Sequence, residues 1–309
     1  MNEITVFPPA TVANVVCGFD CLGFALDDPV DAMTLRLTDE KGVRITHLDD
    51  YGLPADPERN IAGVALLAML DAIHHETGFE LEITKKIKPG SGVGSSSASA
   101  VGAVVAADKL LNERFSRLEL AEFAMRGEQV ASAGRHADNV APCLYGGFTL
   151  VRSVDPLDIV ELEFPEIAVT VIHPQIEVKT ADARRMLPAE IPLKSGVRAW
   201  SNVGALVAAL AKGDLELLAR SLEDAIVEPV RKTLIPHFDA VKTESLRAGA
   251  LGGGISGSGP SIFMLSENQS TARRVAAAMD AVYAESGIDF NIYVTKINSE
   301  GVKFAGAEI

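Results

Sequence analysis

Cysteine, aromatic residues and positive charge are all scarce in this chain of 309 residues. Its three cysteines, Cys17, Cys21 and Cys143, are too few for a disulfide framework, and the first two alone cannot complete a zinc site. We therefore expect reduced thiols and a cytoplasmic protein. The formal net charge of −14 argues against a general nucleic-acid binder, because such proteins carry a basic face.

Long apolar runs are also missing. No apolar run of about 18 residues without charges appears, and the acidic start of the chain is unlike a signal peptide. We therefore expect no membrane contact. The hydrophobic content of 48% is nevertheless ample for a core, and the length suits two ordinary domains or one large one.

The most distinctive stretch present is 89–100, in which three alternating glycines run into consecutive serines. Glycines admit unusual backbone conformations and leave the main-chain amides accessible. The small apolar residues of 98–111 predict a helix, whose N-terminus offers free N–H groups and partial positive charge. This combination predicts a phosphate-binding loop, with serine hydroxyls as extra donors or as an oxygen ligand for Mg²⁺.

The loop fits neither of two common phosphate patterns. No lysine follows Gly94 as a Walker loop requires, and Ser95 stands where a dinucleotide loop needs its third glycine. A separate G-x-G-x-x-G at Gly252, Gly254 and Gly257 precedes a predicted turn and strand instead of a helix, which argues against a dinucleotide site there. A flexible linker is the alternative for 89–100, although linkers rarely lead into such a helix.

Three lysines, Lys85, Lys86 and Lys88, come just before the loop. Their pattern is typical of a solvated strand end. Even there they would raise the local positive potential beside an anionic ligand.

Periodicity predicts a mixture of strands and helices. Strands are expected at 4–7, 33–38, 43–46, 80–84, 146–151, 167–172, 261–265 and 290–297. Helices are expected at 60–77, from Ser116 toward Ser132, and at 198–212, 214–225, 236–248 and 270–286. Asn60 is the expected N-cap of the first, with Gly78 as its stop, and Ser116 with Glu119 forms a capping-box pattern in the second.

The order of these elements favours an α+β fold, because strands and helices do not alternate regularly. Asp155-Pro156 and Phe164-Pro165 mark the expected border region. We therefore divide the chain into two domains, 1–160 and 161–309.

Further polar clusters suit a ligand site. Asn14 and Asp20 lie in a segment that would make a poor helix, and 135–139 places four polar or charged groups in five residues. Arg184 and Arg231 are suited to gripping a carboxylate. Ordinary turns and solvated surface residues are the alternatives for each cluster.

Taken together, these stretches resemble the GHMP kinase superfamily, named for galactokinase, homoserine kinase, mevalonate kinase and phosphomevalonate kinase. The resemblance rests on Pro-Ala-Thr-Val-Ala-Asn at 9–14 with Gly-Phe-Asp at 18–20, on Gly-Val-Gly-Ser-Ser at 92–96, and on Gly-Ile-Ser-Gly-Ser-Gly-Pro-Ser at 254–261. Within the superfamily, the segments 18–23, 136–142, 180–184 and 228–231 are most similar to homoserine kinases.

The resemblance implies a fold and an assembly. The domain 1–160 should bind ATP and form a mixed α/β domain with a left-handed βαβ crossover, a hand that sequence rules alone would not predict. The domain 161–309 should be ferredoxin-like. ATP and substrate should meet in the cleft between the two, and the enzyme should be a homodimer.

The resemblance also implies an activity, namely transfer of the γ-phosphoryl group of ATP to the side-chain hydroxyl of L-homoserine with Mg²⁺ as cofactor. Ser96 and Glu128 match the superfamily's metal-binding positions. The implied catalytic residues are these two together with Asn139. The implied ATP ligands are Asn60, Lys88, Pro89, Gly90, Ser91, Gly92, Val93, Gly94, Ser95, Ser96, Ser97, Ala98, Ser99 and Gly257. The implied substrate ligands are Asn14, Asp20, His136, Asn139, Thr180, Arg184 and Arg231.

One position departs from part of the superfamily, because Asn139 stands where some members place an aspartate base. An amide cannot accept the proton, so either Asp138 does or no side chain acts as base. A loose transition state demands little of a base, which favours the second choice. The alternative functions are another small-molecule kinase of the superfamily and a nucleotide sensor without turnover. The pair Ser96 and Glu128 argues against the sensor.

Overall fold

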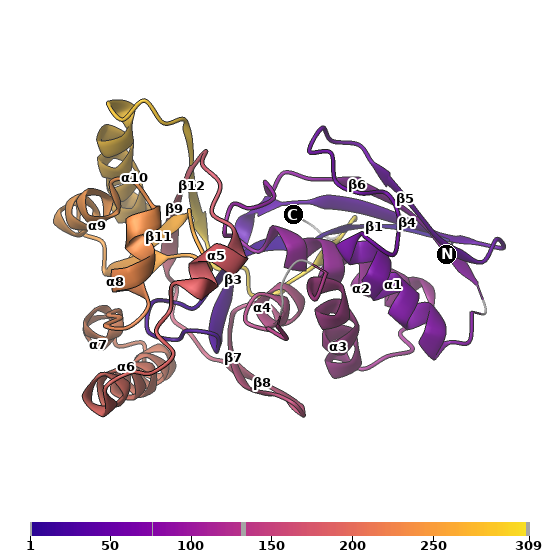
Figure 1. Cartoon of the computed structure of the whole chain (residues 1–309), viewed down its shortest axis with the longest axis horizontal. Helices are drawn as coiled ribbons and strands as arrows, with labels where there is room; N and C mark the ends of the chain where they lie inside the picture. Colours follow the sequence, from indigo (N-terminus) through magenta and orange to yellow (C-terminus); the bar gives the residue numbers. More distant parts are fainter. Residues whose placement is uncertain (1, 76, 131–133, 307–309) are drawn as a thin grey trace.

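The computed structural model describes residues 2–75, 77–130 and 134–306. Figure 1 shows two lobes side by side, with the early part of the chain (indigo to magenta) in one and most of the later part (orange to yellow) in the other. The arrangement agrees with the expected α+β class and the two-domain fold.

The N-terminal lobe has a sheet of order β13-β1-β4-β6-β5 with helices packed on it (Figure 1). Its strands are β1 (Glu3–Phe7), β4 (Ala32–Thr38), β5 (Gly42–His47), β6 (Gly78–Thr84) and β13 (Lys303–Phe304). Its helices are α1 (Ile61–Ala72), α2 (Ser95–Leu110), α3 (Arg117–Glu128) and α4 (Val140–Tyr145). The parallel strands β5 and β6 are joined through α1 and form a βαβ unit.

A second sheet, of order β2-β3-β7-β8, lies between this sheet and the C-terminal lobe. Its strands are β2 (Pro9–Ala13), β3 (Leu22–Val30), β7 (Phe148–Val154) and β8 (Leu157–Leu162). The ring of Phe24 lies 4.9 Å from that of Phe148 and 5.6 Å from that of Phe263, which belongs to the C-terminal lobe. This shared apolar core joins the two lobes and fixes the cleft between them.

The C-terminal lobe has an antiparallel sheet of order β10-β11-β9-β12. Its strands are β9 (Ala168–Pro174), β10 (Gly252–Ile255), β11 (Ile262–Ser266) and β12 (Phe290–Lys296). Its helices are α5 (Thr180–Arg185), α6 (Leu193–Lys212), α7 (Leu215–Ser221), α8 (Glu228–Arg231), α9 (Phe238–Arg247) and α10 (Gln269–Ala284), with a 3₁₀ turn at Lys232–Leu234. A split βαβ–βαβ order over such a sheet is ferredoxin-like, as expected.

Every residue of β9 is buried, because its side chains alternate between two cores. Val169 and Val171 join the core that includes residues of α6. Ile172 joins the core beneath α10. The apolar run that predicts this strand thus reflects packing on both faces.

Two cap predictions are confirmed. The Asn60 side chain accepts a hydrogen bond from Gly63 N at 3.2 Å, and Ser116 with Glu119 forms both bonds of a capping box. The first helix nevertheless ends at Ala72, short of Thr77, and His74 and His75 have φ values of 55° and 53°. Left-handed backbone of this kind stops a helix without any glycine. The predicted extension of the second helix toward Ser132 lies partly outside the described residues.

The border prediction needs correction. Asp155-Pro156 lies in the hairpin turn between β7 and β8, and β8 itself continues across residue 160. β13 returns to pair with β1, so the end of the described chain lies in the N-terminal lobe. Gly252–Ile255 is also a strand, which was not among the predicted ones, and it pairs along its length with β11.

No helix within 2–75, 77–130 and 134–306 has the length and apolar character needed to cross a bilayer. Cys17, Cys21 and Cys143 are all unpaired thiols.

Candidate active site

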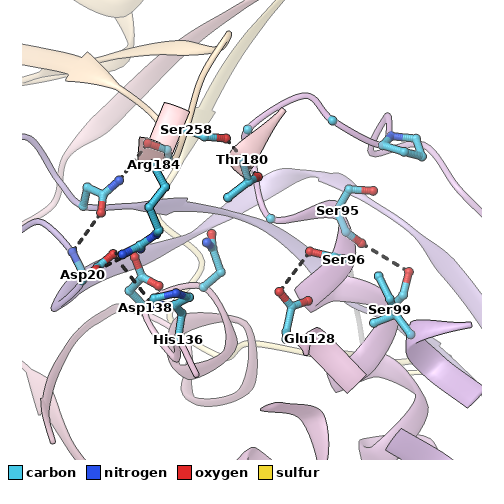
Figure 2. A pocket seen from close by; sticks show the side chains of 18 of the residues that line it. Asp20, Ser95, Ser96, Ser99, Glu128, His136, Asp138, Thr180, Arg184 and Ser258 are labelled. Atoms are coloured by element: carbon cyan, nitrogen blue, oxygen red, sulfur yellow. Dashed lines mark hydrogen bonds and ion pairs between the residues drawn. The ribbon is translucent and has the colours of Figure 1, made fainter. Parts of the chain in front are cut away.

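A cavity of about 290 Å³ opens where the glycine-rich loop, the turn after β2, the turn after β10 and α5 converge. Figure 2 shows its two ends, with Ser96 and Glu128 at one and Asp20, Arg184 and His136 at the other. The predicted ligands that line it are Asn14, Asp20, Pro89, Gly90, Gly92, Gly94, Ser95, Ser96, Ser99, Glu128, His136, Asn139, Thr180, Arg184, Arg231 and Gly257. Segments far apart in the sequence therefore meet at one place.

The main-chain carbonyls of the loop are tied to other parts of the protein. Ser261 Oγ donates to Ser91 O at 2.6 Å, Ser256 Oγ donates to Gly92 O at 2.7 Å, and Thr11 N donates to Val93 O at 3.1 Å. In a trans peptide the N–H points opposite to the C=O. We infer that fixing these carbonyls turns the following N–H groups toward the cavity, as anion binding requires.

Two glycines of the loop have no room for a side chain. Gly94 precedes α2 with φ +69°, and a Cβ there would lie 1.9 Å from Thr11 Oγ1. Gly92 has φ +82°, and its Cβ would lie 2.5 Å from Gly259 O. Left-handed backbone and close approach together explain why glycine recurs at this spacing.

Ser96 and Glu128 bring an oxygen pair to the cavity from α2 and α3. Ser96 Oγ donates to Glu128 Oε2 at 3.2 Å (Figure 2). Burial raises the pKa of Glu128, and its hydrogen bonds with serine hydroxyls oppose that rise. A carboxylate and a hydroxyl at the start of a phosphate loop fit Mg²⁺, which takes one or two protein oxygens and completes its shell with water and phosphate.

The opposite end of the cavity carries charges of both signs. Arg184 Nη2 donates to both carboxylate oxygens of Asp20 at 2.8 and 3.0 Å. His136 Nδ1 lies 3.9 Å from Asp20 Oδ1. Desolvation lowers the pKa of His136, so its imidazole is neutral at pH 7 and can both donate and accept hydrogen bonds.

Arg231 is the deepest charge at this end, with only 3% of its surface exposed. Its guanidinium donates to the main-chain oxygens of Ala183 and Gly257 at 3.3 and 3.1 Å. It forms no ion pair with any residue that the structure describes. Desolvation, and then the charge of Arg184, lowers its pKa from the ordinary value. A buried cation paired only with carbonyls favours an anionic ligand.

Asn14 and Asn139 are oriented by the protein itself. Asn14 Nδ2 donates to Gly257 O at 2.8 Å, and Asn14 Oδ1 accepts from Asp20 N at 3.0 Å, so this side chain fastens two turns together. Thr11 Oγ1 donates to Asn139 Oδ1 at 2.7 Å. That bond leaves the Nδ2 group of Asn139 as the donor available to a ligand.

Asp138 lies between these groups and is 5% exposed. Desolvation raises its pKa to about 7, with the charge of Asp20 as a second cause. The sequence offered this residue only as an alternative base. The structure places it in the cavity wall beside the predicted ligands.

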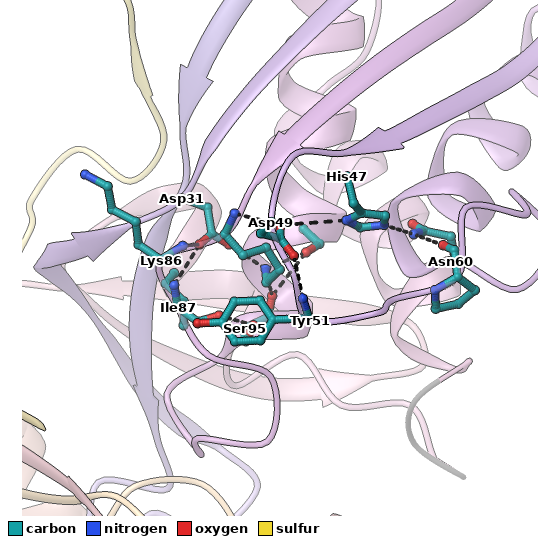
Figure 3. A network of polar contacts seen from close by, with 11 residues as sticks. Asp31, His47, Asp49, Tyr51, Asn60, Lys86, Ile87 and Ser95 are labelled. Atoms are coloured by element: carbon teal, nitrogen blue, oxygen red, sulfur yellow. Dashed lines mark hydrogen bonds and ion pairs between the residues drawn. The ribbon is translucent and has the colours of Figure 1, made fainter. Parts of the chain in front are cut away.

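Lys85 also reaches the cavity, and the expectation of a solvated strand end was wrong for it. Its Nζ pairs with Asp31 Oδ2 at 2.5 Å and donates to Ser95 O and Ser99 Oγ at 3.0 and 2.9 Å. The other oxygen of Asp31 accepts from two successive amides, Lys86 N and Ile87 N (Figure 3). This buried network, formed by Asp31 and 85–87, joins the start of the loop to the first turn of α2.

Six predicted ATP ligands, Asn60, Lys88, Ser91, Val93, Ser97 and Ala98, lie outside the cavity lining. Asn60 Nδ2 contacts His47 Nε2 at 3.0 Å and Pro54 O at 2.7 Å while Oδ1 caps α1 (Figure 3), so the protein already engages both ends of this amide. Lys88 Nζ donates to Gln175 Oε1 at 2.7 Å. The other four are buried beneath the loop.

Other lining residues carried no signal of their own in the sequence. Leu53 and Ile61 add apolar surface near the loop, and Ser258 lies opposite Thr180, with their hydroxyls 3.3 Å apart. An isolated leucine or serine is common everywhere. Only the folded chain shows that these line a cavity.

Comparison with known proteins places this geometry in a family. A model described as GHMP kinases N terminal domain matches residues 60–147, and one described as GHMP kinases C terminal matches residues 206–285. The two lobes and the loop between them are thus those of a GHMP kinase. The crystal structure of L. major mevalonate kinase in complex with R-mevalonate has the same fold, with a TM-score of 0.70 at 19% identity over 95% of both chains.

Higher sequence identity is found with homoserine kinases. The homoserine kinase of Chloroherpeton thalassium is 44% identical to this chain, over 97% of the chain and 99% of that protein. The crystal structure of homoserine kinase from Cytophaga hutchinsonii is 51% identical and superposes with a TM-score of 0.95 over 98% of both chains. The chain belongs to the homoserine kinase family.

The raised pKa of Asp138 predicts a specific pH dependence of stability. Because the folded-state pKa of about 7 lies above the ordinary value of 3.8, the folded protein binds the extra proton and loses stability as pH rises from about 4 to 7. The loss is at most about 1.4 kcal/mol per pH unit. Asp138→Asn should remove this component, so its free energy of unfolding should exceed that of the wild type at pH 8 and approach it at pH 5.

Urea unfolding at the two pH values measures the difference. Asp239→Asn is the matched control, because Asp239 is exposed and pairs only at the surface with Lys232. Identical pH dependence in the wild type and both variants would contradict the assignment.

Proposed function

We propose that this protein transfers the γ-phosphoryl group of ATP to the side-chain hydroxyl of L-homoserine and releases ADP and O-phospho-L-homoserine. The observation that carries the proposal is Arg231, a buried cation without an ion-pair partner in the described chain, beside the Asp20–Arg184 pair. An α-amino acid brings one carboxylate and one ammonium, and these complement the two arginines and the aspartate. The names of the full-length relatives support the same substrate.

The loop and the start of α2 suit the phosphates of ATP. Gly92, Gly94, Ser95 and Ser96 line the cavity where the inferred N–H groups converge. The apolar surface of Leu53 and Ile61 suits the base. Contact between adenine and the Asn60 side chain would require its present hydrogen bonds to be shared or exchanged.

Ser96 and Glu128 would hold Mg²⁺. A bound Mg²⁺ would neutralise charge on the phosphates during transfer. Ser96 Oγ donates to one oxygen of Glu128, which keeps the buried carboxyl oriented.

The substrate contacts follow from chemical complementarity. Asp20 suits the ammonium, and Arg184 with Arg231 suits the carboxylate. The Asn139 amide and the neutral His136 imidazole suit the hydroxyl end. Asn14 and Thr180 lie in the same wall, where Asn14 holds the turn and Thr180 adds a hydroxyl.

The reacting hydroxyl loses a proton as its oxygen forms the new bond to phosphorus. Asn139 offers a donor and therefore orients the hydroxyl without accepting its proton. We propose that the proton passes to phosphate or water, because a loose transition state creates little need for a side-chain base. Complete loss of turnover in Asp138→Asn, with substrate binding and folding intact, would instead identify Asp138 as the base.

Two further proposals accompany the activity. An alcohol phosphotransferase acting on homoserine belongs to threonine biosynthesis in the cytoplasm, and the three free thiols agree with a reducing compartment. We also propose a homodimer, supported by exposed apolar side chains on α6, with Leu193 at 73% and Trp200 at 64% exposure. A single-chain mass by light scattering would contradict the dimer.

The activity itself is tested by multiple-turnover assays with ATP and a panel of alcohols. L-homoserine should be phosphorylated faster than mevalonate or galactose, and chelation of divalent cations should abolish transfer. ATP hydrolysis without acceptor is the control. Preference for a sugar or mevalonate would indicate another kinase of the superfamily, and nucleotide binding without product would indicate a sensor.

Arg231→Ala should raise the Michaelis constant for L-homoserine at least tenfold, because removing one partner of a buried charge pair costs about 2–5 kcal/mol. The Michaelis constant for ATP should change little. Arg231→Lys keeps the charge but loses the planar fork, so an intermediate value is expected. Arg152→Ala, at an exposed surface pair, is the control. An unchanged constant in Arg231→Ala would remove this residue from the site.

A further inference from the structure

Phe19 lies directly against both arginines of the substrate end. The guanidinium carbon of Arg231 is 5.0 Å from the centroid of its ring, and that of Arg184 is 5.5 Å away. Both distances fall within the range of cation–π attraction. One aromatic ring thus contacts two like charges that come from different helices, α5 and α8.

The ring is not part of the apolar core. Phe19 is partly buried, yet it belongs to none of the apolar clusters that the described residues form. A large aromatic side chain outside the core usually serves an interaction of its own. The interaction available here is with the two guanidinium groups.

The backbone holds the ring in place. Cys21 N and Leu22 N both donate to Gly18 O, at 3.0 and 2.9 Å, and Asp20 N donates to Asn14 Oδ1. A Cβ at Gly18 would lie 2.4–2.5 Å from atoms of Leu22, so the turn is closely packed. This tight turn fixes Phe19 next to Asp20, which pairs with Arg184.

We propose that Phe19 is a positioning residue that holds Arg184 and Arg231 ready for the substrate carboxylate. Contact through an aromatic face uses none of the N–H donors at the guanidinium edge, so it takes up none beyond those already donated to Asp20, Ala183 and Gly257. Desolvation, and then the charge of Arg184, lowers the pKa of Arg231. The negative face of the ring offsets part of the repulsion between the two cations. The inference rests on the proposed function, because it assumes that the ligand of both arginines is the carboxylate of an amino acid.

The test is Phe19→Leu, which keeps most of the volume and removes the aromatic face. The dissociation constant for L-homoserine should rise about five- to tenfold, while that for ATP should stay within twofold. Phe19→Tyr should restore wild-type affinity. Phe115→Leu is the matched control, because Phe115 is also partly buried but packs against Phe123 far along the chain from the site, at a centroid distance of 5.0 Å.

A second ligand separates positioning from general damage. 3-Aminopropan-1-ol keeps the ammonium and hydroxyl of homoserine and lacks the carboxylate. Its inhibition constant should be unchanged by Phe19→Leu, since it has no group for the arginines. Equal weakening of both ligands, or unchanged homoserine affinity, would overturn the role of Phe19.

The result stays separable from the proposed function. A wild type that binds and phosphorylates L-homoserine, with Phe19→Leu unaffected, overturns only the positioning role. If the wild type neither binds nor phosphorylates L-homoserine, both the proposed function and the positioning role of Phe19 are overturned. Melting temperatures of all variants are measured alongside, and Phe19→Met provides the same test if the leucine variant is unstable.

Discussion

Hydrogen bonds to the carbonyls of the glycine-rich loop hold that loop against both lobes. The conformation of the proposed phosphate site depends on these bonds. Ser256 and Ser261 come from the C-terminal lobe, and Thr11 from the second sheet, yet all three bind the same short segment, 91–93. The loop has few side chains and cannot hold its own conformation. The conformation of the loop is therefore set by the segments that bind it. The shared core around Phe24 and Phe263 fixes the positions of those segments relative to one another.

Local charge, and not net charge, decides which ligands this acidic protein accepts. The chain carries −14 overall, but Lys85, Arg184 and Arg231 all line one cavity. Lys85 is compensated by Asp31, and Arg184 by Asp20. Among the residues that the structure describes, Arg231 donates to two carbonyls, contacts an aromatic face and forms no ion pair, so a charge without a direct partner lies deep in the cavity. An anion that enters this site loses its hydration shell, and the preformed Arg231 site replaces those interactions.

The sequence was informative where local composition alone defines the chemistry. Alternating glycines before a small-residue helix predicted the loop, and the Ser116 capping box predicted a helix start. Long-range partners could not be predicted. Lys85 was expected in solvent because nothing in its neighbourhood indicates Asp31, which lies 54 residues earlier. β10 consists mostly of glycine and became a strand only because β11 pairs with it. Phe19 belongs to the Gly-Phe-Asp motif at 18–20, but the sequence indicated no role for it, since its partners come from 184 and 231.

On the proposed function, the Asp20–Arg184 pair would connect substrate binding to the position of α5. In the structure both oxygens of Asp20 accept from Arg184, whose side chain is 42% exposed. An amino acid entering the site would place its ammonium against the aspartate and its carboxylate against the arginine, so one internal pair would become two pairs with the ligand. Exposed pairs contribute little to stability, typically about 0–1 kcal/mol, so opening this one has a small cost. A ligand with only an ammonium or only a carboxylate would break the Asp20–Arg184 pair and give a new partner to only one of these two residues. On the proposed function, this geometry therefore favours zwitterions over simple alcohols.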